Sequence, residues 1–283
     1  MKKITRRSFM AAAGLTVAAL ALTACGGSSS TASSAAASSV ASSAAASSEA
    51  ASAAATELTT VEAGKLTMAT NAAFPPYEMT TDAGEFEGID IETAQAIADN
   101  LGLELQIDDM DFDAALLSVQ QGKADIVMAG VTVTDERKAV MDFSDSYATG
   151  IQSIIVPNDS DIASPDDLAG KKIGTQRGTT GYLYCSDDFG EDAVVAYDNG
   201  LTAVQALNNG QVDAVVIDNE PAKAYVESNP GLKILDTSYA EEDYAIGMNK
   251  SNTALLEAVN AALEELKADG TLQSIVDKYI KAE

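Results

Sequence analysis

The sequence SVQQGKADIV at residues 118–127 has a counterpart, ALNNGQVDAV, at residues 206–215. Each segment contains the apolar spacing of a helix end, a glycine that suits the position just past a helix, and an apolar run typical of a buried strand. Units of this kind occur throughout α/β proteins. The repetition after 88 residues further predicts two lobes built on one plan.

The segments around this repeat alternate between strand and helix patterns from Lys65 to the C-terminus. Such alternation with short connections predicts an α/β fold with mainly parallel sheets. We expect strands at residues 66–70, 103–107, 124–129, 151–156, 172–175, 193–197 and 212–217. We expect helices at residues 89–101, 112–121, 180–185, 201–208, 221–227, 253–267 and 272–280.

The repeat also aligns Gly130 with Asp218, and each of these residues follows the carboxyl end of a predicted strand. Ligands of open α/β sheets bind at that edge. Two such edges that face each other would form a cleft, so both positions are candidates for ligand binding.

The composition excludes several classes of protein. Lys and Arg number 17 against 43 Asp and Glu, a net charge of -26, which argues against a nucleic acid partner. The absence of histidine excludes Ser-His-Asp catalysis and histidine-ligated zinc. The two cysteines, Cys25 and Cys185, exclude a disulfide framework, and we expect no metal and no cofactor. We expect Cys185 to be reduced and partly buried.

Residues 1–24 have the features of an export signal, with basic residues at the start and an apolar run from Phe9 to Leu22. This run is short for a membrane span of about 20 apolar residues. The ending Leu-Thr-Ala-Cys resembles the lipobox of bacterial lipoproteins, which implies that Cys25 becomes the first residue and bears diacylglycerol and acyl chains such as palmitate. An ordinary signal followed by an unmodified Cys25 is the alternative. The pair Arg6-Arg7 also resembles a twin-arginine signal, so the export route stays open.

Residues 25–64 are predicted to form a tether after this signal. From Gly26 to Ala55, 27 of 30 residues are Gly, Ser or Ala. Such a composition cannot bury enough apolar surface to offset the entropy lost on ordering. We therefore expect a protein anchored by lipid to the extracytoplasmic face of the cell membrane, with a folded part that begins near Lys65.

Arg137 is the most unusual residue among the candidates for ligand binding. Thr134, Asp135 and Glu136 suit the start of a helix, where a cation is disfavoured. A guanidinium near exposed backbone N–H groups could hold a carboxylate through two parallel hydrogen bonds. A surface ion pair with a neighbouring acid, such as Asp142, is the alternative.

Three further places contain candidate residues. The segment GTTG at residues 178–181 could direct N–H groups at an anion or form a plain strand-to-helix turn, and it lacks the lysine of a P-loop. Asp218 could meet an ammonium group or cap the following helix. Phe74 and Phe112 could form apolar walls or belong to the core.

Together these stretches resemble the polar amino-acid branch of the periplasmic-type solute-binding proteins of ABC importers, known as bacterial solute-binding protein family 3. The resemblance covers Lys65 to the C-terminus and is strongest at TNAAFPPYE (70–78), GVTVTDER (130–137), DFSD (142–145), GTTG (178–181) and VDAVVID (212–218).

This resemblance implies a two-lobed clamshell of type II, in which each lobe is a mixed sheet flanked by helices. One lobe would comprise residues 65–150 and 245–283, and the other residues 151–244. The chain would cross between the lobes near residues 148–152 and 243–247.

The resemblance also implies how a free amino acid would be held. Arg137 would grip the α-carboxylate, with help from the backbone N–H groups of Thr132 and Thr180. Asp218 and the carbonyl of Gly130 would receive the α-ammonium group.

The ligand side chain would lie between Phe74 and Phe112, with Asn71 and Gln176 near its far end. Many relatives have Asp where this sequence has Asn71. The neutral amide favours a neutral polar side chain, such as that of glutamine or cystine. Arginine and lysine stay open as ligands, because Glu78 or another acid could substitute for the missing carboxylate.

The implied function is the capture of a polar amino acid and its delivery to an ABC permease and its ATPase, by a monomer anchored in the membrane and not by an enzyme. A ligand-sensing receptor protein is one alternative, and it would need a separate membrane partner because a polar helix precedes Glu283. A dehydratase of the aromatic amino-acid pathway, which shares this fold, is the other. The lack of histidine and of an obviously placed acid argues against it.

Overall fold

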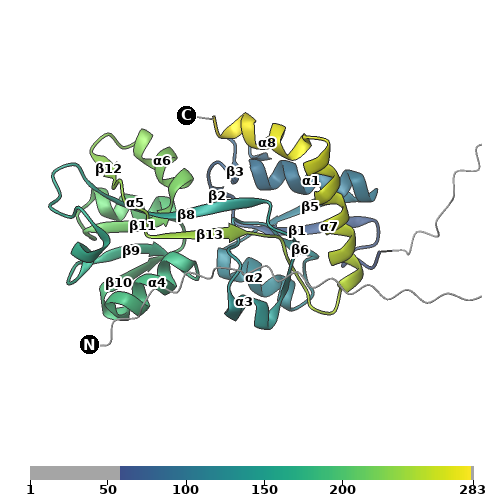
Figure 1. Ribbon diagram of the computed structural model, residues 1–283, viewed down its shortest axis with the longest axis horizontal. Helices are drawn as coiled ribbons and strands as arrows, with labels where there is room; N and C mark the ends of the chain where they lie inside the picture. The colour runs from purple at the N-terminus through teal and green to yellow at the C-terminus, as the bar shows by residue number, and fades with distance from the viewer. Residues whose placement is uncertain (1–57, 282–283) are drawn as a thin grey trace, which may run out of the picture. The chain divides into compact units, whose positions relative to one another are not determined.

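The computed structural model describes residues 58–281. The predicted export signal, Cys25 and the first part of the tether therefore lie outside the described residues. The described chain forms two mixed sheets flanked by helices, which confirms the predicted α/β class (Figure 1). We call the parts around these sheets the first lobe and the second lobe.

The sheet of the first lobe has the strand order β5-β1-β6-β14-β7. Strand β1 is parallel to β5 and β6, whereas β14 is antiparallel to β6 and β7. The strands are β1 (Lys65–Thr70), β5 (Glu104–Asp109), β6 (Ile126–Val127), β7 (Asp142–Phe143) and β14 (Gly247–Met248). A small separate sheet contains β2 (Ala73–Phe74), β3 (Glu78–Thr80) and β4 (Phe86–Glu87).

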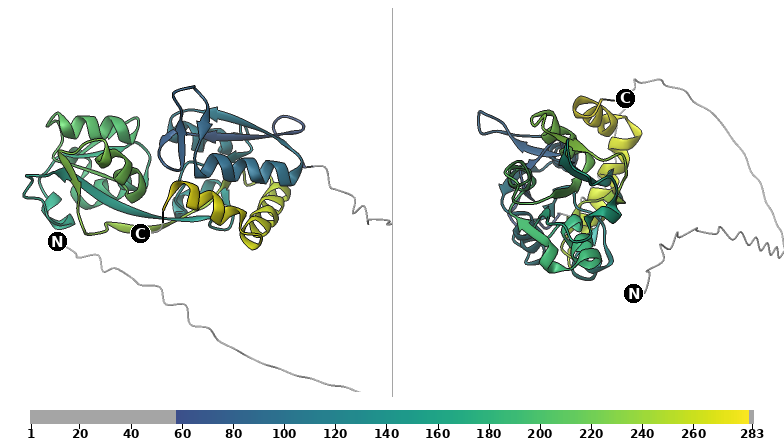
Figure 2. Two further views of the ribbon diagram at one scale, coloured as in Figure 1. Left: turned by 90° about the horizontal axis from the view of Figure 1, so that it is seen from above. Right: turned by 90° about the vertical axis from the view of Figure 1, so that its left-hand side faces the viewer.

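The helices of the first lobe bury apolar faces against this sheet. Helices α1, α7 and α8 pack against one another (Figure 2). In α1 the buried residues Ile91, Ala94, Ile97 and Ala98 recur at helical spacing, which explains why this sequence forms an amphipathic helix. The helices are α1 (Ile89–Leu101), α2 (Phe112–Gln120), α3 (Asp135–Val140), α7 (Thr253–Ala268) and α8 (Thr271–Tyr279).

The sheet of the second lobe has the strand order β10-β9-β11-β8-β12, and β13 also pairs with β8. Its strands are β8 (Ala148–Pro157), β9 (Ile173–Gln176), β10 (Val194–Tyr197), β11 (Ala214–Asp218), β12 (Leu232–Ile234) and β13 (Ala240–Tyr244). Its helices are α4 (Thr180–Phe189), α5 (Gly200–Asn208) and α6 (Asn219–Glu227), with short 3-10 turns at Pro165–Leu168 and Glu191–Ala193. Cys185 on α4 is a free thiol and fully buried, not partly buried as expected.

Strands β8 and β13 connect the two lobes (Figure 1). They pair antiparallel with each other, and hydrogen bonds from Tyr147 N to Tyr244 O and from Ala245 N to Val131 O continue this link into the first lobe. The described residues group into one compact unit by their contacts, so the predicted lobe boundaries stay a prediction.

The expectation of mainly parallel sheets is wrong. Strand β8 is antiparallel to β11, β12 and β13. The chain enters the second lobe along β8 and returns along β13, and two adjacent strands that run between the lobes in opposite directions must pair antiparallel. The strand expected at residues 124–129 is also shorter, because only Ile126–Val127 form β6, and the helix expected to end at 185 continues to Phe189.

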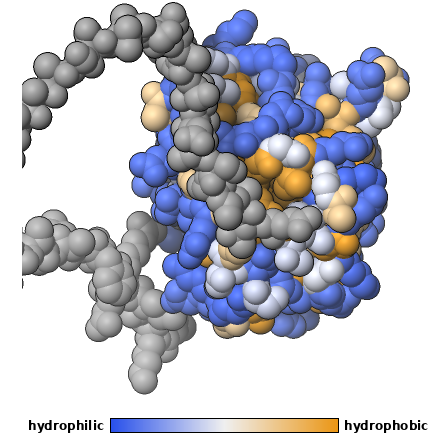
Figure 3. Space-filling model, turned by 90° about the vertical axis from the view of Figure 1, so that its right-hand side faces the viewer, coloured by the Kyte–Doolittle hydropathy of each residue, from blue (hydrophilic) through white to orange (hydrophobic). Residues whose placement is uncertain are grey.

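The surface in the view of Figure 3 is mostly hydrophilic, with a smaller group of hydrophobic residues near its centre. Within residues 58–281, the helices are all too short or too polar to cross a bilayer. The predicted tether meets the first lobe before its expected end, since Val61 N donates to Asp125 Oδ1 at 2.8 Å.

The repeat found in the sequence has a physical basis in two aspartates. Asp125 N donates to Thr67 O, and Asp125 Oδ2 accepts from Thr67 N at 2.8 Å. Asp213 makes the same reciprocal pair with Lys172, with its Oδ2 at 2.7 Å from Lys172 N. In both lobes the aspartate, which directly precedes its own strand, thus ties that strand to the neighbouring segment.

Replacing these aspartates should have unequal effects on stability. Asp125 is 4% exposed and accepts from two N–H groups, so Asp125→Ala leaves both groups without that acceptor and should cost about 2–3 kcal/mol. Asp213 is exposed, so Asp213→Ala should cost roughly 0.5 kcal/mol, because water can replace the lost bond. Urea unfolding of both variants measures the difference. Equal losses of unfolding free energy in the two variants would show that burial does not make the hydrogen bonds of Asp125 more important for stability than those of Asp213.

Candidate ligand-binding site

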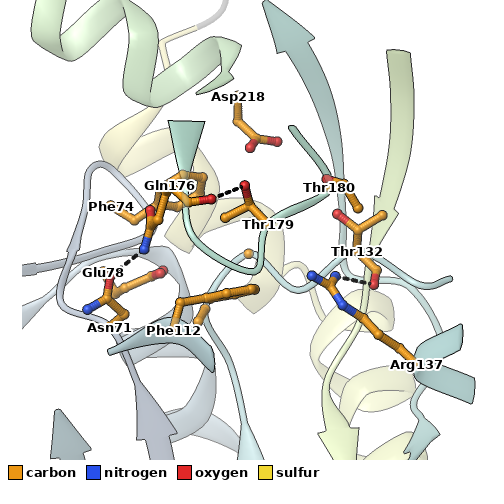
Figure 4. Close-up of a pocket in the computed structure, with 12 residues that line it drawn as sticks. Asn71, Phe74, Glu78, Phe112, Thr132, Arg137, Gln176, Thr179, Thr180 and Asp218 are labelled. Atoms are coloured by element: carbon orange, nitrogen blue, oxygen red, sulfur yellow. Dashed lines mark hydrogen bonds between the residues drawn. The ribbon is translucent and has the colours of Figure 1, made fainter. Parts of the chain in front are cut away.

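A cavity lies between the two lobes (Figure 4). All nine residues predicted to bind a ligand line it, and Glu78, Ala129 and Thr179 line it as well. The structure therefore brings the predicted residues together, and their roles toward a ligand stay a prediction. The nine residues are Asn71, Phe74, Phe112, Gly130, Thr132, Arg137, Gln176, Thr180 and Asp218.

Arg137 points into this cavity and is 8% exposed (Figure 4). Its Nη1 donates to Thr132 O at 2.7 Å in the first lobe, and its Nη2 donates to Gly178 O at 3.1 Å in the second lobe. The guanidinium carbon also lies 5.3 Å from the centre of the Phe112 ring, within the range of a cation–π contact. The alternative of a surface ion pair is therefore wrong.

The local sequence explains how a cation comes to the start of α3. Thr134 caps this helix, because its side chain accepts from Arg137 N at 3.2 Å. The side chain then turns away from the helix end toward carbonyl groups. Burial lowers the pKa of Arg137, and the negative charge of Glu242 opposes that effect. The guanidinium still stays charged at neutral pH, because the ordinary pKa of arginine lies far above neutrality.

Asp218 supplies the opposite charge at the end of β11. Its carboxylate accepts from Gln152 Nε2 at 2.8 Å and from the hydroxyl of Tyr244. The side chain makes no capping hydrogen bond to α6, so the alternative of a helix cap is wrong. Burial raises the pKa of Asp218 to about 7, the Tyr244 hydroxyl opposes this rise, and the charge of Glu242 adds to it.

Because the pKa of Asp218 is raised, this residue makes the stability of the folded protein depend on pH. Between its ordinary pKa of 3.8 and about 7, the folded protein keeps a proton that the unfolded chain has lost. This contribution to stability is therefore present at low pH and is lost as the pH rises through 7. A cation placed beside Asp218 would favour the ionised form and release that proton.

The far end of the cavity is rich in hydrogen-bond acceptors (Figure 4). Asn71 Oδ1 accepts from Gln176 Nε2 at 2.9 Å, across the two lobes, and Asn71 Nδ2 donates to Met110 O at 2.8 Å. Glu78 lies beside Asn71 and is fully buried. The amide nitrogen of Asn71 thus donates to the main chain, while the oxygen atoms of Asn71 and Glu78 lie at this end of the cavity.

Glu78 pairs with a second buried carboxyl group, that of Asp90. Both oxygens of Glu78 and Oδ1 of Asp90 lack a donor partner, whereas Asp90 Oδ2 accepts from Gly130 N at 3.0 Å and Tyr147 Oη at 2.8 Å. Burial and the charge of Asp90 raise the pKa of Glu78 well above its ordinary value, and burial raises the pKa of Asp90 to about 6. A single proton shared by the two carboxyl groups satisfies this geometry.

Gly130 occupies a position that only glycine fits. Its φ angle is +54°, and a Cβ atom there would lie 2.8 Å from Phe74 Cε1. Since Asp90 holds the N–H of Gly130, the main chain at this point is fixed against the aromatic wall of the cavity.

Sequence reasoning missed one further charged residue at this site. Glu242 on β13 is 6% exposed, and its Oε2 accepts at 3.0 Å from each of Thr132 Oγ1, Thr180 Oγ1 and Gln152 Nε2. Its position within the acidic run 241–243 indicates a solvated surface, and only the alternating burial along β13 shows that it faces inward.

The arrangement can bind a zwitterion by charge complementarity. A buried cation and a buried carboxylate lie in one cavity with aromatic rings and neutral amides between the lobes. Buried charges are stable when paired, so a ligand with a carboxylate and an ammonium group would offset the burial of both protein charges. The residues from 58 to 281 contain no cluster of acidic or thiol groups suited to a metal ion.

Comparison with known proteins identifies a matching family and similar proteins within it. The family model described as bacterial extracellular solute-binding proteins, family 3, matches residues 66–282. The L-cystine-binding protein of Escherichia coli (strain K12) is 33% identical over 225 residues, which cover 78% of this chain and 85% of that protein.

Solved structures show the same fold. An ancestral arginine-binding protein bound to arginine has a TM-score of 0.74 and 43% identity over 77% of this chain and 98% of that chain. An ancestral arginine-binding protein bound to glutamine has a TM-score of 0.73 and 42% identity over 77% and 99% of the two chains. These similarities confirm the predicted two-lobed clamshell.

Proposed function

This chain belongs to family 3 of the bacterial extracellular solute-binding proteins, and from this premise we propose that it captures a free polar amino acid for an ABC importer. The main support is the burial of Arg137 and Asp218, with opposite charges, in a single cavity between the lobes. The names of the relatives, which are binding proteins for amino acids, support a binding role over an enzymatic one.

The two charges suggest how the ligand lies. Its α-carboxylate meets Arg137 and the N–H groups at Thr132 and Thr180, the second of which opens helix α4 and has no acceptor within that helix. Its α-ammonium group meets Asp218 and the carbonyl of Gly130. The ligand thereby contacts both lobes, which favours the closed form.

The far end of the cavity indicates the class of side chain. The oxygens of Asn71 and Glu78 are acceptors, so they suit a side chain that ends in N–H donors. Glutamine and arginine both have planar groups of this kind. The solved structures of an ancestral arginine-binding protein bound to arginine and bound to glutamine support this choice. Cystine is a further candidate, because the relative from Escherichia coli is named as an L-cystine-binding protein.

The setting of this function is the outer face of the cell membrane. We infer that Cys25 is lipid-modified, that the rest of the predicted tether up to residue 64 holds the folded part, a monomer, at the membrane, and that an ABC permease with its ATPase receives the amino acid. The resemblance to a lipobox and the Gly, Ser and Ala composition support this setting. Two acyl signals hold a protein stably on a membrane.

The pair of charges can be tested by substitution. Arg137→Ala should weaken amino-acid binding roughly 30- to several thousand-fold, because it leaves a buried carboxylate without its partner. Arg137→Lys should also bind poorly, since a point charge cannot form two parallel hydrogen bonds. Arg177→Ala is the matched control, because Arg177 is exposed beside Gln176. Isothermal titration calorimetry gives the dissociation constants, and equal affinity in Arg137→Ala and Arg177→Ala would exclude the proposed pocket.

The class of side chain can be tested at Asn71. Asn71→Asp adds a negative charge to the far end of the cavity and should raise the preference for arginine over glutamine by at least about tenfold. Glu78→Gln should weaken the binding of arginine more than that of glutamine. Calorimetry with glutamine, arginine, lysine and cystine measures these ratios. Unchanged ratios in both variants would show that the side chain does not reach this end.

The anchor can be tested independently of the pocket. Cys25→Ala should release the protein from the membrane or block its processing, because the predicted acyl chains are attached to that sulfur. Membrane fractionation of the full chain measures the outcome. Cys185→Ala is the control, since that thiol is buried in the second lobe. Membrane association of Cys25→Ala equal to that of the control would rule out lipid anchoring.

A further inference from the structure

Glu242 stands out among the buried charges because it lies on a strand that connects the lobes. In β13, Glu241 and Asp243 are exposed whereas Glu242 is 6% exposed. Glu242 is paired with Gly150 of β8, so both connecting strands meet at this position. A carboxylate that is buried in such a place needs strong hydrogen-bond partners.

The partners of Glu242 come from both lobes. Its Oε2 accepts from Thr132 Oγ1 in the first lobe and from Thr180 Oγ1 in the second, each at 3.0 Å. Gln152 Nε2 donates to the same oxygen at 3.0 Å and also to Asp218 Oδ2 at 2.8 Å. Hydrogen bonds to an ionised acceptor are stronger than neutral ones, so this oxygen is a firm link between the lobes.

The two threonines are the same residues whose N–H groups are proposed to bind the ligand carboxylate. Because their hydroxyl hydrogens are directed at Glu242, both side chains are held in one orientation. Separation of the lobes must move Thr132 away from Thr180 and so break at least one of these bonds. The link is therefore specific to the closed form.

We propose that Glu242 is a positioning residue that couples lobe closure to ligand binding by holding Thr132 and Thr180 together. This inference rests on the proposed function and deepens it. A residue that stabilises the closed form raises the affinity for every ligand of that form by a similar factor, because the binding-competent fraction rises. Glu242 thus affects affinity without contact to the ligand side chain.

The charges around Glu242 predict a second effect, which is a change in the pH dependence of ligand binding. Arg137 on α3, Tyr184 on α4, Asp218 on β11 and Tyr244 on β13 all interact electrostatically with Glu242. Tyr77 and Glu78 in turn face Asp218 from the first lobe. Among these groups Glu242 contributes to the raised pKa of Asp218, so removal of its charge should lower that pKa. Ligand binding through the ionised Asp218 should then persist to lower pH.

The test compares Glu242→Gln with Glu241→Gln, which removes the same charge from the exposed neighbour on the same strand. Calorimetry with glutamine and with arginine from pH 5.5 to 8.5 gives affinity and pH dependence, and small-angle scattering without ligand gives the radius of gyration. In Glu242→Gln we expect affinity for both amino acids to fall about tenfold by a common factor. We also expect the pH midpoint to move to lower pH and the radius without ligand to increase. In Glu241→Gln all three should match the parent.

Thr180→Val is a second variant that keeps the N–H group and removes the other half of the link, and it should also weaken binding and increase the radius. If Glu242→Gln and Thr180→Val match Glu241→Gln in affinity, midpoint and radius, the inference is overturned. If the parent binds none of the tested amino acids, the proposed function fails instead. In that case the radius without ligand still decides whether Glu242 links the lobes.

Discussion

The burial of the Arg137 guanidinium is the constraint on which the rest of the cavity depends. A cation taken out of water must be compensated, and here two carbonyl groups, one from each lobe, accept its hydrogen bonds. Only the bond to Gly178 O crosses to the second lobe, so closure of the lobes replaces water at this charge with a carbonyl acceptor. Carbonyl groups are neutral, so the guanidinium keeps its positive charge and is able to attract a carboxylate.

The other charged groups near the cavity lie close to the Arg137 guanidinium and interact with it. Glu242 and Asp218 bring negative charge close enough to influence the pKa of Arg137. Their hydrogen-bond donors, Gln152 and Tyr244, lie on or beside the strands that connect the lobes. A network built on the connection between two lobes responds to any change in their separation, which is the property that a capture protein needs.

The sequence predicted the long elements and the site better than it predicted the short ones. Helices α1 and α7 were recognisable because their apolar residues recur at helical spacing, and the nine site residues because they form motifs in a fixed order. The two-residue strands β7 and β14 contain no pattern of their own and form only by pairing with distant partners. Glu242 and the pair of Glu78 with Asp90 depend on which charges become buried together, and a single sequence does not contain that information.

The most direct measurement is calorimetry of the preferred amino acid beside two analogues, one decarboxylated and one acetylated at the α-amino group. Each analogue keeps the side chain and removes one of the two charges that the cavity is proposed to bind. We expect both analogues to lose at least about a hundredfold in affinity, since each leaves Arg137 or Asp218 buried without its partner. Binding of either analogue as tight as that of the amino acid would show that the two lobes do not close around a zwitterion.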